Sequence, residues 1–137
     1  MVSSIRAACG AALVTVLLAA CAPPVATNLS TIEQRVFAPN CTFSSCHSTQ
    51  GRAGQLVLEP GKSFGNLVGQ RPEQKAAAEE GLLRVAPGDL LHSFLLVKLR
   101  DPMDRKYGDR MPQHQAPLDA EDLGAIEGWI RLGARND

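Results

Sequence analysis

Hydrophobic and polar positions divide the chain into an apolar first segment and a mixed remainder. Residues 7–20 form an almost unbroken apolar run behind Arg6, the only charged residue before it. This arrangement is typical of an export signal, in which a positive residue precedes roughly 7–15 apolar residues and a cleavage site. The run is too short and too rich in alanine for a membrane-spanning helix. We therefore predict a signal peptide over residues 1–20.

The signal segment ends at residues 18–21 in the sequence LAAC, which resembles a bacterial lipobox. In a lipobox the cysteine, here Cys21, is lipidated and becomes the first residue of the mature protein. Ordinary cleavage nearby, with Cys21 incidental, is the alternative. The next residue is Ala22 rather than Asp. By resemblance to lipoprotein sorting, this favours the outer membrane of a Gram-negative bacterium, on its periplasmic face, with residues 21–30 as a lipid-anchored tether.

Short amphipathic stretches predict the helices of a single domain over residues 31–135. Ser30 and Glu33 have the spacing of a capping box, in which each side chain bonds to the backbone of the other, so a helix is expected from Ser30. The residue before a proline disfavours helical geometry, so Pro39 is expected to end this helix near Ala38.

Later stretches predict further helices. Residues 90–100 are apolar on nearly every helical face, which indicates a buried helix after the capping residue Asp89. A last helix is expected from Asp119 until Gly133. Two weaker patterns are a helical turn at residues 63–68 and a polar, alanine-rich helix at residues 72–80, expected to be an exposed insertion. The predicted fold is a mainly α domain of four to five short helices with long loops.

Charge and composition narrow the function. Lys plus Arg number 14 and Asp plus Glu also number 14, which argues against nucleic-acid binding, because that needs an excess of basic residues. Aromatic residues make up only 4%, so a small loop-rich domain needs an additional stabilising feature at its centre. The four cysteines are the candidates. Cys9 leaves with the signal and Cys21 carries lipid, so Cys41 and Cys46 remain for the domain.

His47 directly follows the second of these cysteines, the arrangement that attaches c-type haem. Each thiol, Cys41 and Cys46, would add across one haem vinyl group, and His47 would bind the iron through Nε2. The usual spacing has two residues between the cysteines, whereas this chain has four. The wider loop can reach both vinyl groups if Ser44 and Ser45, which are small, bulge outward.

Other interpretations of the same residues remain open. A Cys41–Cys46 disulfide would suit an exported protein, and the chain would then be a haemless lipoprotein acting as a structural or binding module. A zinc site would need His92 or His114 in addition, and the adjacency of Cys46 and His47 makes joint ligation of one ion awkward. A catalytic Cys–His pair is disfavoured by an oxidising compartment.

From about Ile32 to Ala134 the chain resembles the cytochrome c-like domains of planctomycetes and myxobacteria. After the Cys–Cys–His segment the matching pieces are, in order, AGQLVL at 53–58, VAPGD at 85–89, SFL at 93–95, DRMP at 109–112, PLDAED at 117–122 and WIRLGA at 129–134. Myxobacterial relatives include versions with four residues between the cysteines. The resemblance implies one covalently bound haem c between an N-terminal and a C-terminal helix, with electron transfer as the role.

The resemblance also places the sixth iron ligand at Met111. Its position agrees, because it lies in a proline-bordered loop shortly before the last helix. A soft thioether ligand favours ferrous iron. Met103, His92 and His114 are alternatives for this position, and Arg110 could pair with a haem propionate.

We therefore expect a monohaem electron carrier rather than an enzyme, because no acid–base pair of a substrate pocket is evident. A sensor or peroxidase-like protein with an open sixth position is a further alternative. The expected partners are an unidentified redox donor and acceptor protein and the lipid membrane, reached through Cys21. The protein is expected to be monomeric and not to bind nucleic acid.

Overall fold

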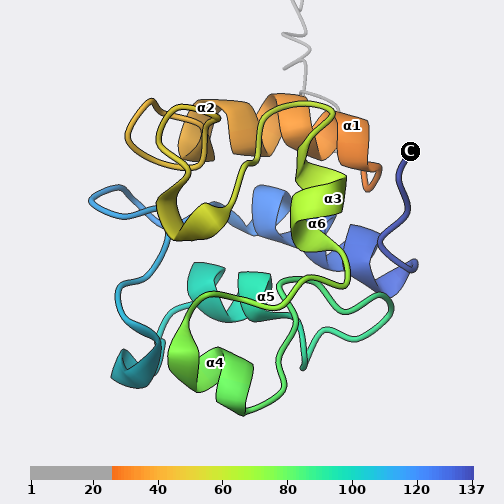
Figure 1. The fold of residues 1–137 in the computed structure, drawn as a ribbon. Coiled ribbons are helices and arrows are strands. Elements are labelled where there is room, and N and C mark those ends of the chain that lie inside the picture. The colour runs from red at the N-terminus through yellow and green to blue at the C-terminus, as the bar shows by residue number, and fades with distance from the viewer. Residues whose placement is uncertain (1–25) are drawn as a thin grey trace, which may run out of the picture.

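The computed structural model describes residues 26–137, so the predicted signal peptide, Cys9 and Cys21 lie outside the described residues. Within residues 26–137 the predicted mainly helical architecture is confirmed: helices are joined by long loops, and no strand is formed (Figure 1). Isolated bridges, such as that between Val68 and Val85, are the β-type pairing in this part of the chain. The short extended backbone segments therefore serve as connections between helices.

The N-terminal helix is longer at both ends than predicted. It is continuous through α1 (Leu29–Ile32), the π-helical segment η1 (Glu33–Phe37) and α2 (Ala38–Cys41). Asn28 caps it, since its side-chain oxygen accepts a hydrogen bond from the N–H of Thr31 at 2.9 Å. The capping box expected at Ser30 is therefore not formed.

Pro39 does not end this helix, contrary to the sequence prediction. The preceding turn is π-helical, and the N–H of Ala38 donates to the carbonyl of Glu33 five residues back. Inside a regular helix a proline lacks one hydrogen-bond donor and its ring clashes with the carbonyl four residues back, and a π-helical turn changes this spacing. The π turn places Pro39 in the first turn of α2. The helix consequently continues to Cys41, which becomes its last residue.

The remaining helical elements are short, except for the last. They are η2 (Ala53–Gln55), α3 (Ser63–Leu67), α4 (Lys75–Glu79), α5 (Phe94–Leu99), η3 (Arg105–Tyr107) and α6 (Ala120–Arg131). As predicted, Asp119 caps α6 by accepting from the N–H of Asp122 at 2.8 Å, and the chain leaves the helix at Gly133 with φ near 100°.

The helix over residues 94–99 begins later than the sequence predicts. The Asp89 carboxylate accepts hydrogen bonds from the N–H groups of Leu91 and His92, at 2.9 and 3.1 Å, and so closes a turn instead of capping a helix. Leu91 is consequently 79% exposed. The sequence pattern predicted helix across this turn because Leu90 and Leu91 continue the helical spacing of the apolar residues that follow.

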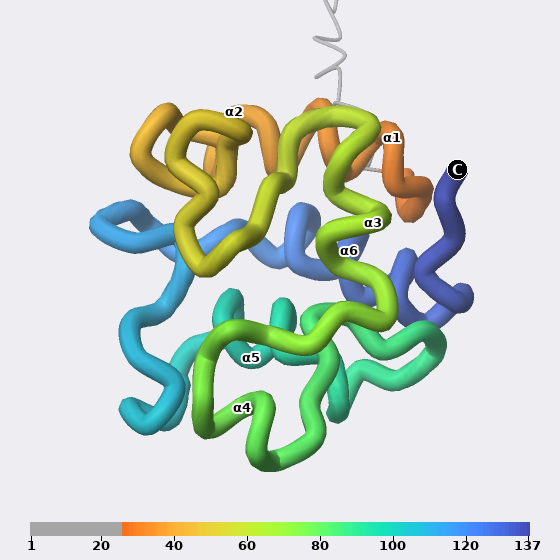
Figure 2. Tube along the Cα trace, in the orientation of Figure 1, coloured from red at the N-terminus to blue at the C-terminus, as the bar shows by residue number. Residues whose placement is uncertain are grey.

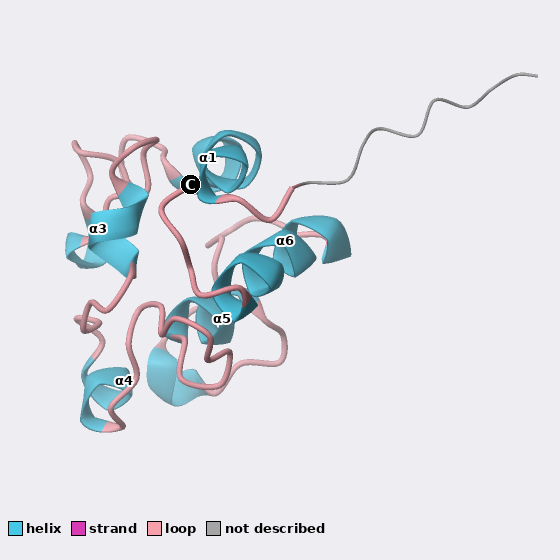
Figure 3. Cartoon of the chain, turned by 90° about the vertical axis from the view of Figure 1, so that its right-hand side faces the viewer, coloured by secondary structure: helices cyan, strands magenta, loops and turns pink. Residues whose placement is uncertain are grey.

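The main core lies between the N-terminal helix and α6, and α5 adds Leu96 and Leu99 to it. The tube and side views show α6 passing between the N-terminal helix and α5 (Figures 2 and 3). The two ends of the domain meet, because the N–H of Ser30 donates to the Asp137 carbonyl at 2.9 Å. Fully burying one of the large apolar side chains in this core stabilises the fold by roughly 1.5–3 kcal/mol.

A second, smaller core lies under α4. Ala77 on this helix is fully buried and packs with Leu82 and Phe94, and the Tyr107 ring contacts Phe94 edge-on at a centroid distance of 5.4 Å. The prediction that residues 72–80 form an exposed insertion is therefore wrong in part, because Ala77 is buried. Ala77 contributes only a methyl group to this core, a contact too small for the apolar pattern to reveal.

Candidate functional site

A cavity of about 210 Å³ lies between the turn after α2, the helix α5 and the loop that precedes α6. Its wall is mostly apolar, and it includes side chains from segments far apart in the sequence: Cys41, His47, Phe94, Lys98 and Met111. The structure therefore brings three of the four residues expected at a haem site into one cavity.

The His47 imidazole is held in one orientation. Its Nδ1 lies 3.0 Å from the carbonyl oxygen of Ala53. A carbonyl can only accept, so Nδ1 carries the proton and Nε2 keeps a free lone pair. Burial lowers the pKa of His47, and the positive charges of Arg84 and Lys98 act in the same direction, against the opposing effect of the Ala53 and Leu56 carbonyls. The ring is therefore neutral, which is the form that binds a metal.

The two cysteines are placed differently. Cys41 lines the cavity, and burial, together with the neighbouring Cys46, raises the pKa of its thiol to about 12. Cys46 lies beside the cavity rather than in its wall, with its sulfur 3.8 Å from the hydroxyl of Ser45. Both thiols are free, so no disulfide joins them. Ser44 and Ser45 are exposed, which is the outward bulge expected for a widened loop.

Met111 reaches the cavity on the loop over residues 101–117, and α5 holds it there through Lys98. The N–H of Met111 donates to the Lys98 carbonyl at 2.7 Å. The Lys98 ammonium donates to the carbonyls of Tyr107, at 3.1 Å, and of Asp109. One lysine therefore binds the loop by both its backbone and its side chain.

The alternative ligands lie elsewhere. His92 is 62% exposed, with its Nδ1 2.6 Å from the Asp89 carboxylate. His114 and Met103 are on the loop but outside the cavity wall. For zinc, the described residues contain no group of three or more His, Cys, Asp or Glu side chains that could hold a metal ion.

Two cations of the cavity wall, Arg84 and Lys98, are not evident from the sequence. The Arg84 guanidinium donates to the carbonyls of Gly54 and Asn66, each at 2.9 Å, and burial lowers its pKa. Arg110, the arginine suggested by the sequence, lies outside the cavity wall and bonds to backbone carbonyls of its own loop. Arg84 stands outside every recognisable motif, so no local signal could have identified it.

Comparison of the chain with family models, with curated proteins and with solved structures found no match. Among residues 26–137, no helix has the length and apolar character needed to cross a bilayer.

Proposed function

We propose that the protein is a monohaem c-type cytochrome that carries single electrons. The observation that carries this proposal is the cavity itself, in which an imidazole with a free Nε2, a methionine and a cysteine come together. His47 and Cys41 come from the segment after the N-terminal helix, and Met111 comes from a loop more than sixty residues later.

The residues present fit a covalently bound haem c. Imidazole nitrogen and thioether sulfur are the axial ligand pair of electron-transferring cytochromes c. The apolar wall of the cavity suits a porphyrin face, and the positive charges of Arg84 and Lys98 suit its propionate groups. Cys41 is in the wall, where a thioether bond is required, and Cys46 is its neighbour.

A bound haem would supply an iron that takes up and releases one electron. The chain's own part is to hold two ligands and to keep water away. The Ala53 carbonyl fixes the proton of His47 on Nδ1 and so directs Nε2 to the metal. Lys98 keeps Met111 at the cavity. With such a group bound, the protein would pass electrons between a donor and an acceptor protein.

The decisive experiment is expression in the periplasm of a host with haem-attachment machinery, followed by pyridine haemochrome spectroscopy and a haem stain on a denaturing gel. The expected result is one haem per chain that stays with the protein on the gel. A colourless protein would overturn the proposal and favour the haemless alternative with its Cys41–Cys46 disulfide. A haem with an open sixth position would favour a sensor or peroxidase-like protein.

The proposed location is the periplasmic face of the outer membrane, with a lipid on Cys21 as the anchor. Several acyl chains at one site anchor a protein firmly. Cells fed a labelled fatty acid should label the wild type, and Cys21→Ser should release the protein from the membrane fraction. An unlabelled wild type, or a variant that stays equally membrane-bound, would remove the anchor from the proposal.

A further inference from the structure

The four-residue spacing between the cysteines forms a closed loop in the structure. The N–H of His47 donates to the carbonyl of Cys41 at 3.0 Å, and the N–H of Cys46 donates to the carbonyl of Phe43 at 2.8 Å. The first of these bonds closes the loop at its base, and the second folds the chain within it. The relative position of the two cysteines is therefore set by the backbone of this loop.

Gly51, in the following turn, lies directly against the loop. A Cβ atom placed on Gly51 would lie 2.6 Å from the carbonyl oxygens of both Ser44 and Cys46, and 2.7 Å from the carbonyl carbon of Ser45. All three are backbone atoms, which cannot rotate away as the end of a side chain can. The N–H of Ala53 also donates to the Cys46 carbonyl, at 3.0 Å. Only glycine permits this approach.

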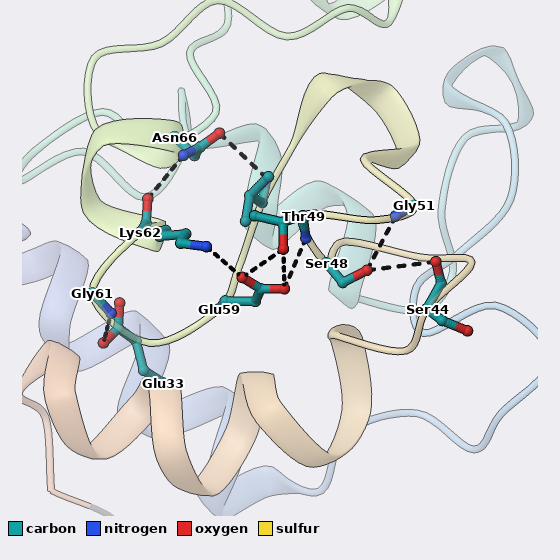
Figure 4. A network of polar contacts seen from close by, with 10 residues as sticks. Glu33, Ser44, Ser48, Thr49, Gly51, Glu59, Gly61, Lys62 and Asn66 are labelled. Atoms are coloured by element: carbon teal, nitrogen blue, oxygen red, sulfur yellow. Dashed lines mark hydrogen bonds and ion pairs between the residues drawn. The ribbon is translucent and has the colours of Figure 1, made fainter.

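The side chain of Ser48 ties the turn to the loop (Figure 4). Ser48 is buried, and its hydroxyl accepts from the N–H of Gly51 at 3.1 Å and donates to the Ser44 carbonyl at 3.5 Å. The same turn ends at Ala53, whose carbonyl orients the ring of His47. One short segment thus contacts the widened loop and also fixes the proposed iron ligand.

We propose that Gly51 and Ser48 are positioning residues that allow the four-residue spacing to serve two thioether bonds. The turn over residues 48–53 presses on the loop and holds Cys46 where its sulfur and that of Cys41 can reach two vinyl groups of one macrocycle. This inference rests on the proposed cytochrome function. It adds the reason why a loop wider than the usual two residues can work in this chain.

The covalent step itself is balanced without a further reagent. Each cysteine S–H adds across a vinyl C=C, so the sulfur bonds to one carbon and the hydrogen goes to the other. Cys41 is fixed by α2 and already lines the cavity, whereas Cys46 is positioned through its contact with the turn. Disturbing the turn should therefore affect the Cys46 bond first.

The test compares wild type, Gly51→Ala and the matched control Gly65→Ala, all expressed with haem-attachment machinery. Gly65 lies in α3, and a Cβ placed on it meets nothing within 4 Å. Three readouts count the thioether bonds: the intact mass, the number of thiols alkylated after denaturation, and the pyridine haemochrome band. That band moves to longer wavelength when one vinyl group keeps its double bond.

We expect wild type and Gly65→Ala to have no free thiol in the domain. Most of the haem-containing Gly51→Ala should have one free thiol, assigned to Cys46 by peptide mapping, and a shifted band. Wild-type thioether numbers in Gly51→Ala would overturn the inference and leave the cytochrome proposal standing. So would a wild type with a single bond through Cys41. A wild type without covalent haem would overturn the proposed function itself.

A second variant applies if Gly51→Ala yields no folded protein. Ser48→Ala keeps every backbone atom of the turn and removes only the hydroxyl that bonds Gly51 and Ser44. We expect a smaller but measurable fraction of chains with a free Cys46 thiol. If Ser48→Ala forms both thioether bonds to the wild-type extent, the turn does not position the cysteines.

Discussion

His47 and Met111 line one cavity, but the two regions that carry them are held differently. The backbone around His47 is bonded on both sides, since its N–H donates to Cys41 and its carbonyl accepts from Leu58, at 3.0 and 2.8 Å. The ring is fixed in addition by Ala53. Met111 lies on a mostly exposed loop, and beside Met111 the contacts to the rest of the domain come from Lys98 of α5. Further contacts, from Lys106 and Tyr107 to the α4 region, hold an earlier part of the same loop.

This difference indicates that one side of the site is preorganised and that the other is adjustable. A ligand held by several short-range bonds keeps its position when the cavity is disturbed, whereas an exposed loop segment held by one neighbouring residue opens at lower free-energy cost. We therefore expect His47 to be required for forming the site and Met111 to tune it. The following predictions test this contrast from the largest expected effect to the smallest.

His47→Ala should have the largest effect. The loss of a metal ligand should exceed the roughly 10–100-fold loss of affinity or activity typical of changes to a ligand's supporting partners, so the yield of protein with low-spin haem should fall by at least about tenfold. Haem-stained gels and absorbance spectra measure this. His92→Ala is the control, because that imidazole is exposed and paired with Asp89, and its spectrum should match wild type.

Met111→Ala should keep the haem but change its properties. The far-red charge-transfer band between sulfur and ferric iron should vanish, the reduction potential should fall, and cyanide should bind faster. Removing the half-buried Met111 side chain should also lower the unfolding free energy of the haem-free chain by about 1–2 kcal/mol. Met103→Ala should leave the band intact. A wild-type spectrum with two imidazole ligands would contradict the assignment, and His92 would then be tested first.

Lys98→Met should weaken the same band without abolishing it, because the methionine remains while its loop loses two hydrogen bonds from the ammonium. Removing hydrogen bonds from a charged, half-buried donor should cost about 1–2 kcal/mol of unfolding free energy. Cyanide should bind faster than to wild type but slower than to Met111→Ala. Lys75→Met is the control, because the Lys75 side chain is 87% exposed. If cyanide binds to Lys98→Met at the wild-type rate, the Lys98 ammonium does not hold the Met111 loop at the cavity.

Glu59→Gln should have the smallest effect, and only through pH. Hydrogen bonds from Lys62 and Thr49 lower the pKa of Glu59 from 4.5 to about 2 (Figure 4). A carboxylate whose pKa is lower when folded stabilises the protein above the unfolded pKa, and this stabilisation is lost as the pH falls through the folded pKa. Thermal melts should therefore show the wild type losing stability between about pH 4.5 and pH 2 more steeply than the variant. If wild type and Glu59→Gln lose stability in parallel as the pH falls, the bonds of Glu59 to Lys62 and Thr49 do not stabilise the segment that follows His47.

Local features of the site were predictable from the sequence because they depend on short spacings. The exposure of Ser44 and Ser45 meets the condition under which a wider loop could reach a haem, and the cap at Asp119 followed from its side-chain chemistry. The end of the N-terminal helix was harder to predict, because a π turn places Pro39 where a helix tolerates it. The width of a turn is set by packing rather than by the residues' intrinsic preferences.

By itself, the sequence predicted the mainly helical class and placed Cys46 immediately before His47, with Cys41 five residues before Cys46. Through the family resemblance it also favoured Met111 among the proposed ligands. Only the tertiary structure decided that Met111 reaches the cavity of His47 and that His92 does not. It also decided that the cavity carries Arg84 and Lys98. The physical reason is that the His47 ring, the Met111 N–H and the side chains of Arg84 and Lys98 all bond to backbone carbonyls. Every residue has a carbonyl, so which one is near becomes evident only when distant segments pack together.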